Sequence, residues 1–452
     1  MSKLTIGVLI KEAAEAHKVG DYIKEKNSYQ ELYDLFKREL GEKHSNTLKA
    51  LNNLANSYSC LGDYNKACEL QNVVCNAFKE ILGEKHLDTL KALNNLACYH
   101  SDLGDYNKAL ELENTVYNER KEILGENHPD TLASLLSLAG SYFDLRDYNK
   151  ACELQGVVYN AFKETLGEKH PNTLSALNNL ANSYSCLGDY NKACELQGVV
   201  YNAFKEILGE KHPNTLSALN NLANSYSCLG DYNKALELKI IVYNTRKEVL
   251  GEKHPDTLSS LNNLAISYSD LGNYNKALEL KIIVYNTRKK VLGEKHPDTL
   301  NALNNLADSY SCLGDYNKAC ELENIVYNAR KEILGEKHLD TLNALNNLAN
   351  SYSDLGDYNK ALELENTVYN GRKEILGEKH PDTLSVLNNL ANSYSDLGDY
   401  SRALKMRKAV YNVRKEILGE KHPDTLSALN NLARSYSDLG DYSRALKMRK
   451  AV

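Results

Sequence analysis

Apolar residues recur along the chain at intervals of three or four, which is the spacing of one face of an α-helix. One such stripe lies between Pro255 and about Leu271 and consists of Leu258, Leu261, Leu264, Ala265 and Tyr268. A second stripe runs from Ala277 to Leu292, after the turn residues 272–274. The pattern predicts two amphipathic helices, here called helix A and helix B, and no β-strand.

The ends of both predicted helices carry recognisable signals. Pro255 suits the first helical position, where its missing amide hydrogen would have no helical acceptor, and Asp256 suits the positive end of the helix dipole. His254 is expected at the N-cap, because a residue that precedes proline avoids the α conformation. Gly293 is expected to end helix B in the left-handed α conformation.

This helix pair is repeated along the chain. The string Leu-Gly-Glu-Lys-His occupies residues 40–44 and returns every 42 residues without an insertion, with Asn for Lys in one copy. The junction contains ten of the twelve histidines and all seven prolines. Since one pair is too small to bury its own apolar stripes, the copies must stack on one another.

The repeat divides the chain into three parts. Residues 1–44 are in register with the later copies but match them poorly, so we expect a degenerate N-terminal capping repeat. Residues 45–422 are expected to form nine 42-residue repeats. Residues 423–452 contain a complete helix A but only part of helix B, and they are expected to form an incomplete C-terminal repeat.

Six positions resemble the tetratricopeptide repeat; in one copy they are Leu180, Ala181, Tyr184, Gly188, Tyr190 and Ala193, and other copies fill nearly every one, with exceptions such as His100 and Arg146. The length of 42 residues and the run Leu-Asn-Asn-Leu-Ala look most like kinesin light chain repeats. The resemblance implies an all-α fold, in which tandem helix-turn-helix repeats stack into a right-handed superhelical α-solenoid. It also implies a non-enzymatic, protein-binding scaffold or cargo adaptor. Kinesin heavy chain is a possible partner, although residues 1–44 lack the sustained heptads of a coiled coil.

In this family helix A lines the concave surface, so its inward positions imply a peptide-binding groove. Asparagine fills most of them, and a side-chain amide can both donate to and accept from a ligand's backbone. The alternative interpretation is that these asparagines only solvate the helix face. The candidate groove residues are Asn52, Asn53, Asn56, Asn178, Asn179, Asn182, Asn220, Asn221, Asn224, Asn262, Asn304, Asn346, Asn347, Asn350, Asn388, Asn389, Asn392 and Asn430.

Some copies depart from this pattern. The most divergent one carries Leu136, Gly140 and Phe143, which either form an apolar pocket for a ligand side chain or reflect sequence drift. Of the residues that precede the asparagines by one turn, only Lys49 and Lys91 are basic. A clamp for acidic C-termini is therefore not expected.

Charge and composition exclude several other classes of function. The net charge of −6 and the pI of about 6.1 do not suggest a nucleic-acid partner. No segment approaches the ~20 apolar residues that span a bilayer, so we expect no membrane insertion and a cytoplasmic protein. The ten cysteines fall mostly at two repeat positions without a CxxC pair, which favours reduced thiols.

The junction also places Glu252, Lys253, His254 and Asp256 together. Equivalent copies on successive turns are typical of helix ends, whereas an active site needs one preorganised constellation. We therefore predict no catalytic residues, no cofactor and no metal site. Two hypotheses remain: a scaffold that binds peptide segments or partner proteins in its groove, or a structural array that self-associates without a peptide ligand.

Overall fold

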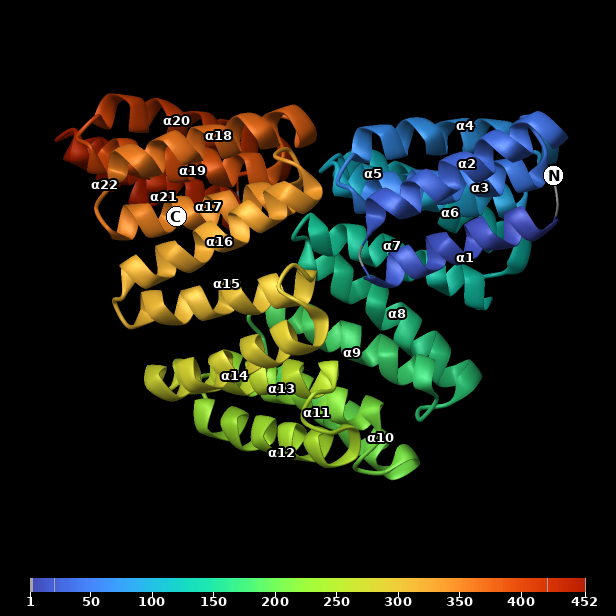
Figure 1. Cartoon of the computed structure of the whole chain (residues 1–452), viewed down its shortest axis with the longest axis horizontal. Helices are drawn as coiled ribbons and strands as arrows, with labels where there is room; N and C mark the ends of the chain where they lie inside the picture. Colours follow the sequence, from blue (N-terminus) through green and yellow to red (C-terminus); the bar gives the residue numbers. More distant parts are fainter. Residues whose placement is uncertain (1–2, 20, 421, 452) are drawn as a thin grey trace. The chain divides into compact units, whose positions relative to one another are not determined.

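The computed structural model describes residues 3–19, 21–420 and 422–451, and within these ranges its regular secondary structure consists of 22 α-helices (Figure 1). The prediction of an all-α fold is therefore confirmed. The chain forms two compact units, one of residues 1–60 and 66–309, the other of residues 61–65 and 310–452.

The first unit holds most or all of fifteen helices. Odd-numbered helices are helix A of a repeat and even-numbered ones are helix B. Their bounds are α1 Lys3–Val19, α2 Tyr22–Leu40, α3 Ser45–Cys60, α4 Tyr64–Leu82, α5 Leu87–Asp102, α6 Tyr106–Leu124, α7 Pro129–Asp144, α8 Tyr148–Leu166, α9 Pro171–Cys186, α10 Tyr190–Leu208, α11 Pro213–Cys228, α12 Tyr232–Leu250, α13 Pro255–Asp270, α14 Tyr274–Leu292 and α15 Pro297–Cys312.

The second unit continues the same alternation. Its last helix has only 8 residues, whereas α20 has 19. The bounds are α16 Tyr316–Leu334, α17 Leu339–Asp354, α18 Tyr358–Leu376, α19 Pro381–Asp396, α20 Tyr400–Leu418, α21 Pro423–Asp438 and α22 Tyr442–Arg449.

Local hydrogen bonds explain where each helix begins and ends. His170 is the N-cap of α9, and its Nδ1 accepts the backbone N–H of Asn172 at 3.2 Å. At the other end of α9 the N–H of Gly188 bonds to the carbonyl of Ser185, and that of Asp189 to the carbonyl of Tyr184. This pair of bonds is a Schellman motif. Asp189 then caps α10, so one residue ends helix A and begins helix B. The predicted histidine cap is confirmed.

The glycine after helix B differs from the expectation. Gly293 has the predicted positive φ of 93°, but its ψ of 163° lies far from the left-handed α region, so that detail of the prediction is wrong. Gly167, the equivalent residue ahead of α9, shows why. Its carbonyl accepts both the backbone N–H of His170 and the hydroxyl of Thr173, so it must point towards the next helix. Only glycine adopts this backbone region readily.

The core lies between repeats as well as within them. Leu174, Leu177 and Leu180 of α9 form one buried cluster with Val200 of α10 and Ala218 of α11. The third of these helices belongs to the next repeat. The apolar stripe of one helix pair is thus covered by its neighbour, which is the physical reason why the repeats occur in tandem.

Candidate functional site

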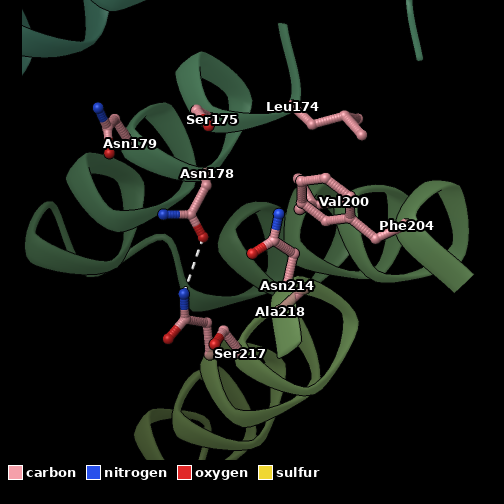
Figure 2. Close-up of a pocket in the computed structure, with 10 residues that line it drawn as sticks. Leu174, Ser175, Asn178, Asn179, Val200, Phe204, Asn214, Ser217 and Ala218 are labelled. Carbon is pink, nitrogen blue, oxygen red and sulfur yellow. Dashed lines mark hydrogen bonds between the residues drawn. The ribbon is translucent and has the colours of Figure 1, made fainter. Parts of the chain in front are cut away.

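Successive A helices are linked by hydrogen bonds between asparagines, which we call the asparagine ladder. Nδ2 of Asn221 on α11 donates to Oδ1 of Asn178 on α9 at 2.9 Å (Figure 2). The second asparagine of one repeat thereby binds the first asparagine of the repeat before it. The same bond of 3.0–3.2 Å joins Asn95 to Asn52, Asn263 to Asn220, Asn305 to Asn262 and Asn431 to Asn388.

Burial of the second asparagine follows the residue type at the first position of the preceding repeat. Asn53 and Asn179 are exposed, and the first position of the preceding repeat is Ile10 and Leu136 respectively, neither of which can accept a hydrogen bond. Where that position holds asparagine, the second asparagine is half-buried, as at Asn95, Asn221, Asn263, Asn305, Asn347, Asn389 and Asn431. Asn53 and Asn179 are therefore second-position asparagines that have no ladder acceptor.

The third asparagine of the predicted groove pattern forms a hydrogen bond with helix B in some copies. Oδ1 of Asn182 accepts from Nε2 of Gln197 at 3.1 Å, and Oδ1 of Asn392 accepts from Nη2 of Arg407 at 2.8 Å. Both donors lie on helix B of the same repeat. These asparagines hold the two helices of a repeat together in addition to facing outward.

The structure places the predicted residues on one face of the A helices, at two levels of burial. The exposed ones are Asn53, Asn56, Asn179, Asn182, Asn224, Asn350 and Asn430. The half-buried ones are Asn52, Asn178, Asn220, Asn221, Asn262, Asn304, Asn346, Asn347, Asn388, Asn389 and Asn392. The exposed side chains keep the greatest capacity for a ligand.

A helix-B residue that sequence reasoning missed lies beneath this face. We call it the floor position. It is either aromatic or cationic: the phenylalanines are Phe36, Phe78, Phe162 and Phe204, and the arginines are Arg120, Arg246, Arg288, Arg330, Arg372 and Arg414. The available signal was that four of the five phenylalanines share one phase of the 42-residue repeat.

Arginine at the floor position ties two A helices together. Nη1 of Arg246 donates to the backbone carbonyl of Asp256 at 3.3 Å, and its Nη2 donates to Oγ of Ser217 at 3.2 Å. Ser217 lies on α11 and Asp256 on α13. Burial lowers the pKa of Arg246, and the Asp256 carboxylate opposes that shift. The guanidinium thus spans the space between consecutive repeats.

At two of the four phenylalanines of the floor position a cavity lies above the ring. Above Phe204 lies a cavity of about 290 Å³. Figure 2 shows its walls, which come from three helices: Leu174, Ser175, Asn178 and Asn179 of α9, Val200 of α10, and Asn214, Ser217, Ala218 and Asn221 of α11.

A second cavity, of about 490 Å³, lies above Phe78 three repeats earlier. It occupies the corresponding space between α3, α4 and α5, with Asn52, Asn53 and Asn95 on its rim. It also contains Lys49 and Lys91, the two basic residues noted in the sequence.

In the divergent repeat, two of the three side chains that were candidates for an apolar pocket pack against other residues of the protein. Leu136 packs against the buried cluster around Leu135 and Val158. The ring of Phe143 lies edge-on to Tyr148, with 5.1 Å between ring centroids. The hypothesis of a ligand pocket at these residues stays a prediction.

A second helix-B residue, two turns before the floor position, is buried and polar in nine repeats. We call it the inner position: Gln71, Glu113, Gln155, Gln197, Lys239, Lys281, Glu323, Glu365 and Arg407. At Glu365, burial first and then the nearby Asp396 raise the pKa to about 7, although Ser393 donates a hydrogen bond that opposes the rise. At Lys239, burial lowers the pKa and Asp270 opposes the shift.

The described residues offer neither a cluster of metal ligands nor a membrane-spanning helix. Over the described ranges, no group of three or more His, Cys, Asp or Glu side chains could hold a metal ion. No helix within residues 3–19, 21–420 and 422–451 is long and apolar enough to cross a membrane. All ten cysteines are free thiols.

Family models described as tetratricopeptide repeat match residues 13–80, 130–205, 176–240, 271–324, 313–374 and 382–450, and a further model with the same description matches residues 89–130. These matches cover most of the chain, which therefore belongs to the tetratricopeptide repeat family. Such repeats generally form protein-binding scaffolds and typically lack enzymatic activity. No curated protein matches the chain.

Several solved structures are similar to parts of the chain. Repeats of a putative kinesin light chain from Podosopora anserina are 28% identical, with a TM-score of 0.42, and the match covers 45% of this chain and 96% of that one. BtubC (BKLC) from P. vanneervenii is 18% identical, with a TM-score of 0.40 and coverage of 54% and 92%. The apo form of RapI is 15% identical, with a TM-score of 0.44 and coverage of 63% and 98%.

Proposed function

We propose that this protein is a non-enzymatic scaffold that binds an extended peptide segment of a partner protein along the asparagine-rich face of its A helices. The observation that carries the proposal is the set of exposed asparagines on that face, repeated from one helix to the next. Asn53, Asn179, Asn224 and Asn350 are exposed and make no hydrogen bond through their side chains within the described residues. Asparagine is a mediocre helix former, so its repeated use inside helices favours a role beyond stability.

The asparagine ladder supports the same proposal. A bonded pair such as Asn178 and Asn221 uses one acceptor and one donor, and it leaves further donors and acceptors at the surface. The ladder also fixes both side chains in position before any ligand arrives. A peptide backbone that leaves water needs such partners for each of its own polar groups.

The narrower form of this proposal is a kinesin light chain-like cargo adaptor in the cytoplasm, with kinesin heavy chain as a further partner. Its support is the sequence of the repeat, above all the run Leu-Asn-Asn-Leu-Ala and the 42-residue length. Ten free cysteines agree with a reducing compartment.

The test begins with peptides selected from a random display library against the full chain. Their affinities are then measured for a groove variant that combines Asn53→Ala, Asn179→Ala, Asn224→Ala and Asn350→Ala. Each lost hydrogen bond is worth roughly 0.5–1.5 kcal/mol, so the four together should weaken binding at least tenfold. The effect of salt should be mild, because neutral amides carry the contact.

A matched control replaces four exposed asparagines of the B helices: Asn160, Asn202, Asn244 and Asn286. This control should keep the affinity of the parent chain. If no peptide is selected, and if sedimentation shows association that the groove variant does not change, the structural self-associating array becomes the better description.

A further inference from the structure

Two cavities on the face of the A helices each lie beside an asparagine that has no ladder acceptor. Asn53 and Asn179 are the second-position asparagines that lack a ladder acceptor, and each lies on the rim of a cavity. The cavity beside Asn179 has Phe204 as its floor, and the cavity beside Asn53 has Phe78. An exposed amide and a cavity over a phenylalanine thus come together twice, three repeats apart. Lys49, Asp88 and Lys91 also line the cavity above Phe78, so the two linings differ in charge.

The cavity above Phe204 has a neutral lining. Its apolar part consists of Leu174, Val200, Phe204 and Ala218, and its polar part consists of amides and hydroxyls. No charged side chain lines it. A charged ligand group would lose its water there without gaining an opposite charge, so the lining selects an uncharged apolar group.

The size of this cavity favours a side chain over a free small molecule. Ligand pockets usually measure about 300–1,000 Å³ and enclose most of their ligand. The cavity above Phe204, at about 290 Å³, lies at the lower end of that range, so a single leucine, methionine or phenylalanine side chain would suffice to occupy it. Asn179 and Asn221 on its rim could then bind the backbone on either side.

The contact between the next two repeats shows what closes such a cavity. At the floor position of α12, Arg246 replaces Phe204, and its guanidinium donates to Ser217 and to Ser260 across the gap between repeats. Asp256 stands where the earlier repeat has Asn214, and its negative charge favours the charged form of the same guanidinium. Arginine therefore fills the place that phenylalanine leaves open.

We propose that the cavity above Phe204 is a side-chain pocket of the peptide groove, and that it accepts one uncharged apolar side chain of the bound segment. This inference rests on the proposed function, because it assumes a peptide along the asparagine face. It adds that the bound segment carries a bulky apolar residue, and that arginine closes the corresponding space at the six floor positions that hold it.

The test closes the Phe204 pocket by importing the pair found one repeat later. The double variant Phe204→Arg/Asn214→Asp should pack as α12 and α13 do, and a normal melting temperature would show that it folds. Peptides selected by the parent chain should be enriched in Leu, Met or Phe. Their affinity should fall about tenfold or more in the closed variant, since burying such a side chain is worth at least that much.

The reciprocal variant Arg246→Phe/Asp256→Asn should open a second pocket of this kind and should tighten binding of peptides with an additional apolar residue. If the closed variant folds and keeps the parent affinity, while the four-asparagine groove variant still loses it, the side-chain pocket is wrong and the peptide groove stands. If neither variant changes the affinity, both the pocket and the proposed groove are wrong. Peptides without apolar enrichment would also overturn the pocket.

Discussion

In the first unit, two successive contacts between repeats have the same helix arrangement but different side chains. We call such a contact between consecutive repeats a step. Between α10 and α11 the floor and inner positions are Phe204 and Gln197, both uncharged. Between α12 and α13 the same positions are Arg246 and Lys239, both cationic. We call the first the neutral step and the second the charged step. Both B helices have 19 residues, and both A helices that follow have 16.

The partners of these residues change together with them. Asn214 follows Phe204, whereas Asp256 follows Arg246, and all six floor arginines are followed by aspartate at this position. Likewise Asp270 lies near Lys239, whereas the equivalent residue of the neutral step is Cys228. The comparison shows that residues on the two sides of a contact between repeats change together, so that the contact varies as a whole. A cation that enters the contact brings its anion with it, because an uncompensated buried charge is strongly destabilising.

In the second unit, one contact between repeats lacks this pairing of opposite charges: two acidic residues, Glu365 and Asp396, lie near each other. Glu365 is 3% exposed, and its pKa rises from the ordinary 4.5 to about 7, chiefly through burial. A folded-state pKa above the unfolded one means that the folded chain holds the proton more tightly. Stability should therefore be highest below pH 4.5 with respect to this group and should decline as the pH rises through about 7.

The largest predicted effect follows from Glu365→Gln, which installs the residue of the neutral step. At pH 8 the variant should be more stable than the parent chain by up to about 3 kcal/mol, and the difference should shrink towards pH 4.5. Denaturant titrations across this pH range measure it. The exposed Glu164 provides a control, since Glu164→Gln should leave the pH profile unchanged. A parallel shift of the whole profile in Glu365→Gln would contradict the buried titration.

An intermediate effect is expected when the charged step loses its arginine. Arg246→Leu removes the donors to the Asp256 carbonyl and to Ser217 and Ser260, and it should lower the free energy of unfolding by about 1–3 kcal/mol. Arg246→Lys should recover only part of this loss, because an ammonium cannot reach both helices as a planar fork does. Thermal melts compare the variants. Full recovery by lysine would show that charge alone, and not the fork, matters.

The smallest predicted effect tests whether the repeats are otherwise interchangeable. Arg146 is the only described non-glycine residue with a positive φ, 59°, at a turn where other repeats have glycine. Arg146→Gly should stabilise the chain by about 1 kcal/mol, because glycine adopts this conformation without steric strain. The converse change Gly188→Arg, at a φ of 83°, should destabilise the next turn. Equal stability of Arg146→Gly and the parent chain would mean that the arginine side chain offsets its backbone strain through its own contacts.

The sequence alone determined the features that depend on neighbours along the chain. The three/four spacing in Leu258 to Tyr268 predicts helix A, and His254, Pro255 and the turn glycine mark its ends, because these signals act within one or two helical turns. The 42-residue period then requires stacking and leads to the tetratricopeptide repeat. The asparagine positions could be predicted as a face for the same reason.

Only the tertiary structure decided which of those side chains remain available. Asn178 and Asn221 are 43 residues apart, and their hydrogen bond exists only once two repeats have stacked. The floor position escaped prediction because Phe204 and Arg246 both suit the buried side of an amphipathic helix, yet one leaves a cavity and the other fills it. Whether a residue at the floor position leaves a cavity or fills it depends on the distance between the helices and on the residue across the gap. The spacing of residues along the sequence determines neither of these.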